Sequence, residues 1–330
     1  MSGHINIGLF VVHKGCPNMC SFCNQRQITG EEREITPADV DLAVRTSLAS
    51  SGAEAGAEIA FFGGSFTMID RGSMISLLEA AYAHVKNGSV SGIRISTRPD
   101  GIDDEICALL KQYGVTAVEL GAQSMDDRVL SLNRRGHTAK QVEDASECIK
   151  KHGFELGLQM MTGLYGSTDE DSIETASKII ALSPGTVRIY PTVVLRGTEL
   201  DRLMQEGSFI PRDVEQSVEL CSKLIPMFEN AGIKVIRVGL HSGGGVEENM
   251  TGGAYHPAFR ELCEGRIYRN AAEKELNALP RGGYTVAVGR GMVSRMAGQR
   301  KCNLAYFESK GYSLRIVQDE SLKKYEVKVR

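Results

Sequence analysis

Three cysteines near the start of the chain have a spacing that suits one metal centre. Cys16, Cys20 and Cys23 form a C-x-x-x-C-x-x-C loop that directly follows an apolar run. Thiolates this close together can converge on one metal, and soft sulfur ligands select zinc or iron–sulfur clusters. Structural zinc sites use four ligands, and His13 could complete such a set. Three thiolates would instead leave one metal position open for a small molecule, beside the ring of Phe22.

The elements that position this loop follow a regular alternation. Apolar runs predict seven strands, over residues 5–12, 58–62, 92–95, 115–120, 154–160, 186–190 and 234–238. Helical patterns lie between them, and this alternation is typical of βαβ units with a parallel sheet. Right-handed crossovers curl such a sheet toward a full or partial barrel. The cysteine loop follows the first strand, at the barrel face where active sites lie.

Two helix starts and one interruption can be located from single residues. Thr36 and Pro37 predict an N-cap followed by proline at the first helical position. Thr168 with Asp171 predicts a second capped start. Pro226 is expected to kink or end the helix in which it lies.

Small and polar residues end several of the predicted strands and so gather at one barrel face. Gly63, Gly64 and Ser65 end the second strand, where the absence of a Cβ lets the backbone approach a ligand. Ser96 and Arg98 end the third strand, and a guanidinium can bind a carboxylate with two hydrogen bonds. Ordinary turns and helix caps are the alternative interpretation of both groups.

Composition limits the class of protein. The chain has 330 residues, of which 42% are hydrophobic, and a formal net charge of −3. This charge gives no global reason to bind nucleic acid. No apolar run approaches the ~20 residues of a membrane span, and the first residues lack a signal-peptide pattern. We therefore predict a cytoplasmic protein without membrane association, in which Cys148 and Cys221 belong to the core.

The sequence pattern changes past Leu240. Residues 1–240 are predicted to form the barrel, and residues 241–330 a small α+β extension that covers it. Short strand-like runs occupy residues 284–288, 314–317 and 325–329. Four residues near the expected barrel opening are candidates for substrate contact: Tyr190, Arg237, His241 and His256. Packing and capping are their alternative roles.

The cysteine loop, with an aromatic residue before its last cysteine, resembles the signature of the radical S-adenosylmethionine (SAM) superfamily. Further motifs then resemble the radical domain of the Elongator catalytic-subunit family, especially its shorter bacterial relatives. In chain order these motifs are FFGGSFT (61–67), STRPD (96–100), VELGAQSMD (118–126), NRRGHT (133–138), GLYGST (163–168), RIYPTVVLRGTEL (188–200) and YHPAFRELCEG (255–265).

This resemblance implies a fold, two cofactors and a set of site residues. The fold is a partial (β/α)6 barrel of the TIM-like type. Cys16, Cys20 and Cys23 would hold a [4Fe–4S] cluster, and reductive cleavage of SAM would give a 5′-deoxyadenosyl radical that abstracts hydrogen from a substrate. The residues expected to contact SAM are Phe22, Gly63, Gly64, Ser65, Ser96, Arg98, Gln123, Arg135, Gln159 and Met161. Ser65 stands where the related motif often has an acid.

The resemblance also implies partners, with two departures: the missing acetyltransferase domain, and a gap between the first two cysteines that is longer in the archaeal and eukaryotic members. A flavodoxin or ferredoxin would supply electrons, and wobble uridine in tRNA would be the substrate. Full-length family members carry an acetyltransferase domain, whereas only about 90 residues follow Leu240 here, fewer than a usual domain of ~100–150. We therefore expect no acetyl donor site. We also expect no dense basic patch for tRNA, since Lys323, Lys324 and Arg330 look like ordinary surface charges.

Alternatives to this function remain open at the level of sequence. A radical enzyme could act on a small metabolite or a peptide instead of tRNA. The chain could also be a non-catalytic iron–sulfur or zinc-binding protein on a barrel scaffold, or a zinc-dependent RNA-binding module. The oligomeric state cannot be predicted from these patterns.

Overall fold

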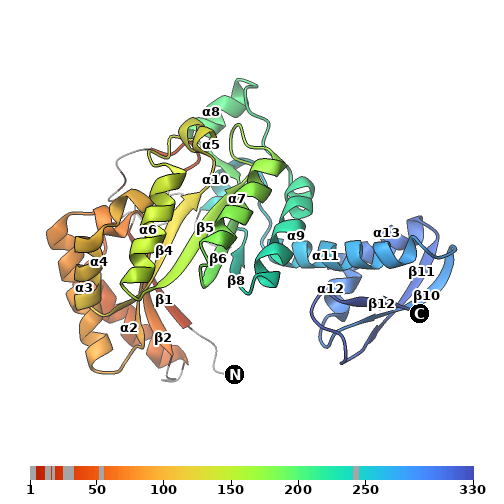
Figure 1. Ribbon diagram of the computed structural model, residues 1–330, viewed down its shortest axis with the longest axis horizontal. Coiled ribbons are helices and arrows are strands. Elements are labelled where there is room, and N and C mark those ends of the chain that lie inside the picture. Colours follow the sequence, from red (N-terminus) through yellow and green to blue (C-terminus); the bar gives the residue numbers. More distant parts are fainter. Residues whose placement is uncertain (1–4, 12–15, 17–18, 25–32, 52–55, 241–244) are drawn as a thin grey trace.

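The computed structural model places the seven predicted strands in one parallel sheet. The structure describes residues 5–11, 16, 19–24, 33–51, 56–240 and 245–330. Neighbouring strands follow the order of the chain, and the sheet curls into an open half-barrel (Figure 1). The strands are β1 (Ile5–Val11), β2 (Ala57–Gly63), β3 (Gly92–Thr97), β4 (Val115–Gln123), β5 (Glu155–Thr162), β6 (Thr186–Pro191) and β8 (Lys234–Val238). The predicted fold class is confirmed, with six β/α units followed by a seventh strand.

Helices cover the outer face of the sheet and share its apolar core (Figure 1). The long ones are α2 (Pro37–Ser51), α3 (Arg71–Lys86), α4 (Asp104–Gln112), α6 (Ala139–Lys151), α7 (Asp169–Ala181) and α9 (Val214–Asn230). Short elements follow the strand ends: η1 (Phe66–Met68), η2 (Pro99–Gly101), α5 (Asp127–Leu132) and α8 (Glu199–Gln205). No helix in the described ranges is long and apolar enough to cross a membrane.

Local signals located the helix starts well. Pro37 is the first residue of α2, and Thr168 and Asp171 form a reciprocal capping box at the start of α7. Pro226 lies inside α9 and does not end it. The helix continues because Leu224 and Phe228, on either side of the proline, are fully buried, and core packing offsets the lost backbone hydrogen bond.

Residues past 240 pack against the barrel before they leave it. Strand β9 (Met250–Gly253), which follows α10 (Val246–Asn249), pairs antiparallel with β7 (Val193–Leu195). Helix α11 (Phe259–Leu276) then packs on α9. Its first half, including Phe259 and Cys263, belongs to the barrel core.

The last part of the chain has a core of its own. We call residues 277–330 the C-terminal lobe. It holds β10 (Gly282–Val288), α12 (Val293–Ala297), η3 (Gln299–Lys301), α13 (Cys302–Ser309), β11 (Tyr312–Gln318) and β12 (Val327–Val329). Its sheet has the order β11-β10-β12, and it lies at the far end of α11 from the barrel (Figure 1). A domain boundary at 240, and coverage of the barrel by residues 241–330, stay predictions.

Candidate cluster and cofactor site

A cavity of about 940 Å³ lies at the C-terminal ends of the barrel strands. Most of the residues predicted from sequence line it together: Cys16, Cys20, Phe22, Cys23, Gly63, Gly64, Ser96, Arg98, Gln123, Arg135, Gln159, Met161, Tyr190 and Arg237. These residues come from the cysteine loop, from strands β2 to β8 or just past their ends, and, for Arg135, from the turn between α5 and α6, which explains how distant motifs meet. Their roles stay predictions, but the fold brings them to one place.

Two of the predicted site residues, Ser65 and His256, are not part of this lining. Ser65 is fully buried behind it, where its hydroxyl lies 2.8 Å from that of Thr97 and accepts from the Arg98 backbone N–H at 3.2 Å. His256 does not line the cavity, and its Nδ1 accepts from the Ala258 N–H at 3.0 Å near the start of α11. The prediction for His241 falls outside the described residues.

The three cysteines differ in exposure, and two of them, Cys16 and Cys20, have cationic neighbours. Cys20 is buried, Cys23 is half-buried and Cys16 is exposed. Although part of Cys16 reaches solvent, partial desolvation is the main cause that raises the pKa of its thiol, followed by the charge of Cys20. Arg98 and Arg135 act in the opposite direction. The site thus offers positive charge to thiolates, which is the ligand form of cysteine.

The guanidinium of Arg135 bridges the cysteine loop and strand β4. Its Nη1 donates to Cys20 Sγ at 3.1 Å and its Nη2 to the Gly121 carbonyl at 2.5 Å. Its Nε donates to His137 Nε2 at 3.3 Å. Burial, and then the charge of Arg135, lower the pKa of His137 to about 4. The imidazole is therefore neutral at pH 7 and can accept this hydrogen bond.

Two other residues of the lining carry polar atoms without partners among the described residues. Gln123 has a left-handed backbone, φ 66°, where β4 bulges, and its buried Oε1 has no hydrogen-bond partner among the described residues. Arg98 binds Asp100 through Nε and Nη2 at 2.8 Å each, while its buried Nη1 is likewise unpartnered. Buried polar groups normally find partners, so Gln123 and Arg98, which both line the cavity, carry one unsatisfied acceptor and one unsatisfied donor beside it.

These features fit an iron–sulfur cluster with SAM. Three thiols and a cation on Cys20 suit a cluster with one open position. Gly63 lines the cavity and has a backbone φ of 100°. A Cβ added at Gly63 would lie 3.0 Å from the Val11 carbonyl oxygen. The neighbouring Gly64 N–H donates to the same oxygen at 2.6 Å. Gly63 thus allows the close approach of β2 to the backbone of β1 at this edge of the cavity.

Sequence reasoning missed a network of charges in the barrel interior. Arg188 pairs with Glu119 through two hydrogen bonds of 2.7 and 2.9 Å, and Gln159 donates to the same carboxylate at 3.0 Å. Arg94 lies 3.6 Å from Glu119 and 3.3 Å from Glu58. The network forms a polar floor beneath the cavity and fixes the position of Gln159.

A sequence signal for this network did exist. Glu119 and Arg188 are charged residues inside otherwise apolar strands, where a buried charge must be paired. Gly157 lies opposite Glu119 on the next strand, and a Cβ there would meet the Glu119 side chain at 2.8 Å. The pairing itself depends on strand register, which the sequence does not reveal.

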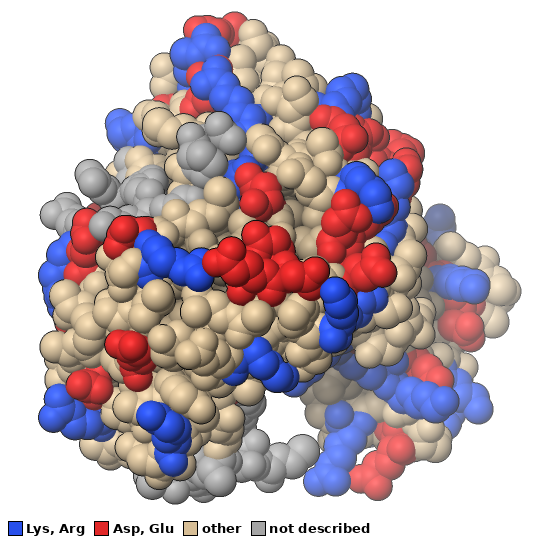
Figure 2. Space-filling model, turned by 60° about the vertical axis from the view of Figure 1, so that its left-hand side comes forward, with Lys and Arg blue, Asp and Glu red and all other residues tan. Residues whose placement is uncertain are grey.

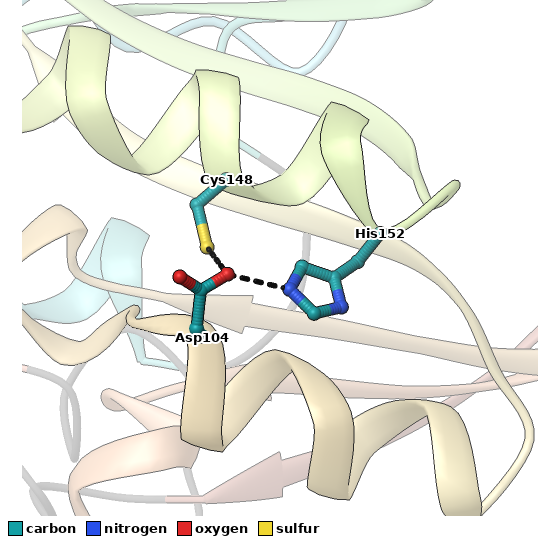
Figure 3. A group of neighbouring side chains, drawn as sticks. All are labelled: Asp104, Cys148 and His152. Atoms are coloured by element: carbon teal, nitrogen blue, oxygen red, sulfur yellow. Dashed lines mark hydrogen bonds and ion pairs between the residues drawn. The ribbon is translucent and has the colours of Figure 1, made fainter.

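A second group of potential metal ligands lies on the outside of the barrel. Figure 3 shows Asp104 of α4 pointing toward Cys148 and His152 on α6 and its C-terminal end. Asp104 lies 2.8 Å from His152 Nε2 and 3.0 Å from Lys151 Nζ, and these bonds lower its pKa to about 2. Because Lys151 and His152 already satisfy the carboxylate, we interpret the group as a polar link between helices. Cys148 is half-buried, with Cys107 Sγ at 3.6 Å.

Comparison with known families agrees with this geometry. Residues 10–179 match the model of the Radical SAM superfamily, and residues 184–269 match that of the Radical_SAM C-terminal domain. The first match covers more than half of the chain, so the chain belongs to the radical SAM superfamily. The superfamily implies a [4Fe–4S] cluster and SAM, in agreement with the sequence prediction.

The relatives confirm the resemblance to the Elongator catalytic subunit. The tRNA uridine(34) acetyltransferase of Methanocaldococcus infernus is 33% identical over 131 residues, 39% of this chain and 24% of that protein. Elongator complex protein 3 of Homo sapiens is 34% identical over 141 residues, 41% of this chain and 26% of that protein. The match therefore spans about a quarter of each relative.

A solved structure shares the fold over most of the chain. Archaeal Elp3 of Methanocaldococcus infernus, with its N-terminus deleted, superposes with a TM-score of 0.64 at 20% identity. The superposition covers 85% of this chain and 65% of that chain. At this identity the likeness shows the shared fold alone.

Proposed function

We propose that this protein is a radical SAM enzyme that holds a [4Fe–4S] cluster on Cys16, Cys20 and Cys23 and cleaves SAM reductively. One observation carries the proposal. The three cysteines line one cavity in which Arg135 donates a hydrogen bond to Cys20, opposite the glycine pair at the end of β2. When bound, the cluster and SAM supply the one-electron chemistry.

The residues of the chain bind, orient and shield these groups. Arg135 would offset the negative charge of the Cys20 thiolate and fix the loop against β4. Gly63 and Gly64 would leave room for the methionyl part of SAM. The unpartnered atoms of Gln123 and Arg98 would bind its polar groups. Phe22 and Met161 add apolar surface that would exclude water from the reacting centre, where a radical would otherwise be quenched.

The substrate and the electron donor form the finer part of the proposal. The names of the relatives make tRNA, with uridine at the wobble position, the first substrate to test. A flavodoxin or ferredoxin-type protein would supply the electron. A cytoplasmic location agrees with both partners and stays a prediction.

An anaerobic assay tests the proposed chemistry. The protein is reconstituted with iron and sulfide, mixed with SAM and dithionite, and analysed for 5′-deoxyadenosine and methionine. Both products are expected from the wild-type protein. The Cys20→Ala variant is expected to form neither, since one cluster ligand and the Arg135 contact are lost. Cys148→Ala, which removes a half-buried thiol outside the cavity, is the matched control and should react normally.

Metal analysis separates the alternatives. Iron and sulfide in a ratio near one, with SAM cleavage, agree with the proposal. Zinc without iron in anaerobically purified protein would contradict it and favour a zinc-binding protein. A full cluster without any cleavage would instead favour a non-catalytic scaffold.

A further inference from the structure

The C-terminal lobe has an arrangement that the barrel chemistry does not use. Strand β10 leads into α12, a short turn, α13 and then β11, which pairs parallel with β10. Met296 of α12 and Phe307 of α13 pack with Val286 on one face of the sheet. The second of the two matched family models ends at residue 269, so the C-terminal lobe lies beyond both models.

The turn between α12 and α13 is tight, basic and strained. It reads Gly298-Gln299-Arg300-Lys301. Gly298 has φ 75°, and a Cβ there would lie 2.7 Å from Cys302 Sγ. Arg300 and Lys301 have φ 52° and 62°, a conformation that costs a non-glycine residue about 1–3 kcal/mol. Both basic side chains are exposed at the tip.

A buried asparagine fixes this turn in place. Asn303, only 3% exposed, donates from Nδ2 to the carbonyls of Met296 at 3.0 Å and Gly265 at 2.8 Å. These bonds tie α13 to α12 and to α11. The strained residues therefore stand on a rigid base rather than on a loose loop.

The lobe differs strongly in charge from the rest of the chain. Residues 277–330 carry 11 Lys and Arg against 4 Asp and Glu, a net charge of +7, whereas the remaining residues carry 27 against 37, a net charge of −10. Figure 2 shows acidic side chains gathered across the middle of the barrel face turned to the viewer. The near-neutral total conceals this separation.

Most of the positive charge of the lobe is available to a partner. Four cations form ion pairs: Arg295, Lys310, Lys324 and Arg330. Seven form no ion pair with an acid of the described residues: Arg281, Arg290, Arg300, Lys301, Arg315, Lys323 and Lys328. Unpaired exposed cations at this density suit a chain of phosphates, because each contact releases a bound counterion.

We infer that the C-terminal lobe binds a single-stranded stretch of RNA, with the Gly298–Lys301 turn on its phosphates. Two helices joined by a G-x-x-K turn, beside a three-stranded sheet, resemble the KH module, whose G-x-x-G turn clamps the backbone of about four nucleotides. The last glycine is replaced by Lys301, which keeps the left-handed backbone and adds a charge. The inference rests on the proposed function, since it places the grip on the proposed RNA substrate outside the barrel.

Binding measurements on the full chain test the inference. Fluorescence anisotropy follows labelled bulk tRNA and a labelled 12-nucleotide single-stranded RNA at several salt concentrations. The Arg300→Gln/Lys301→Gln variant is expected to bind both probes about 10-fold more weakly, with a salt slope shallower by about 1 to 2. Thermal unfolding checks that the variant is folded, and little loss of stability is expected because both side chains are exposed.

A matched control uses two cations on the opposite face of the same sheet. Arg315 and Lys328 lie beside the core-facing Ile316 and Val327 and therefore point away from the helices. Arg315→Gln/Lys328→Gln removes the same charge and is expected to weaken binding by no more than about 3-fold.

Each result has a definite meaning. Equal loss in both double variants, or no loss in the turn variant, would overturn the assignment of the turn. Equal affinity for a 12-base-pair duplex RNA would overturn the preference for single strands. The anaerobic SAM-cleavage assay on the wild-type protein decides the proposed function independently, because it contains no RNA.

Discussion

At the scale of single residues, Arg135 gives the sharpest test of the site. Arg135→Lys keeps the positive charge but loses the planar guanidinium, whose two Nη atoms donate to Cys20 and to Gly121 at the same time. Such supporting residues around metal ligands typically contribute about 10- to 100-fold in affinity or activity. We expect formation of 5′-deoxyadenosine to fall by at least about 10-fold, and the cluster to bleach faster in air.

The neighbouring arginine is the control for this prediction. The Arg134 side chain is 59% exposed and pairs with Glu199 at 2.9 Å. Exposed ion pairs contribute little, so Arg134→Lys should change neither rate by more than about 2-fold. Similar effects of both substitutions would show that the guanidinium of Arg135 has no special role.

Glu119 carries the prediction for stability. Its carboxylate, 1% exposed, faces both Arg94 and Arg188. Glu119→Gln removes the acid that pairs with the buried Arg188, while Arg94 keeps Glu58 and Glu155. Breaking a buried pair in this way costs about 3–5 kcal/mol. Urea unfolding should show this loss in the free energy of unfolding. Glu105→Gln, at a 75% exposed partner of Arg71, should cost less than about 1 kcal/mol.

His137 predicts how stability depends on pH. Its pKa is about 4 in the folded protein and 6.5 in the unfolded chain, so the unfolded state takes up the proton first as the pH falls. The stabilising contribution is complete above pH 6.5 and is lost progressively down to pH 4, by up to about 3 kcal/mol. Unfolding at pH 7.5, 6 and 5 measures this slope. His137→Gln should flatten it, and an unchanged slope would contradict the assignment.

At the scale of elements, the end of β2 links fold to cofactor. Gly63 has a φ of 100°, and a Cβ added there would lie 3.0 Å from the Val11 carbonyl oxygen. Gly63→Ala should therefore lower the free energy of unfolding by about 1–3 kcal/mol and also weaken SAM binding. Gly88→Ala has similar backbone strain, φ 76°, with nothing within 4 Å of the added Cβ. Only the first variant is expected to lose SAM affinity in equilibrium dialysis.

Elements were more predictable than contacts between them. The seven strands and the capped starts of α2 and α7 follow from apolar runs and single capping residues, which are local signals. The Glu119–Arg188 pair is not local, since a one-residue change of register would separate the side chains. The position of Gln123, whose buried Oε1 has no hydrogen-bond partner among the described residues, depends on a bulge in β4. No sequence pattern marks that bulge.

Packing, rather than amino-acid composition, likewise determines which residues belong to each of the two hydrophobic cores. A composition change at residue 240 predicted the boundary there. In the structure, Phe259 and Cys263 of α11 belong to the barrel core, while Tyr268 and Leu276 of the same helix belong to the core of the lobe. One helix thus serves both cores, and a helix shared in this way has no linker for composition to reveal.

At the scale of the whole molecule, this shared helix predicts where a protease separates the C-terminal lobe from the barrel. Arg266, 7% exposed, bridges Glu215 and Glu219 of α9 and so fastens α11 to the barrel. Limited trypsin digestion of the wild-type protein should leave a stable fragment that ends at Lys274 or Arg281, beyond the barrel half of α11. Mass spectrometry identifies that end.

The Arg266→Ala variant extends the same experiment. Without the bridge, α11 keeps its apolar contacts with the barrel and the polar contacts of Arg260 with Val235 and Glu229, while Glu215 and Glu219 lose the Arg266 guanidinium. We expect the lobe to be released several-fold faster, and the melting temperature to fall by a few degrees, corresponding to about 1–2 kcal/mol. Lys223→Ala, which removes only an exposed partner of Glu219, should leave the digestion unchanged. A stable wild-type fragment ending at Lys234 or Arg237 would instead support a boundary at residue 240, with α11 belonging to the lobe.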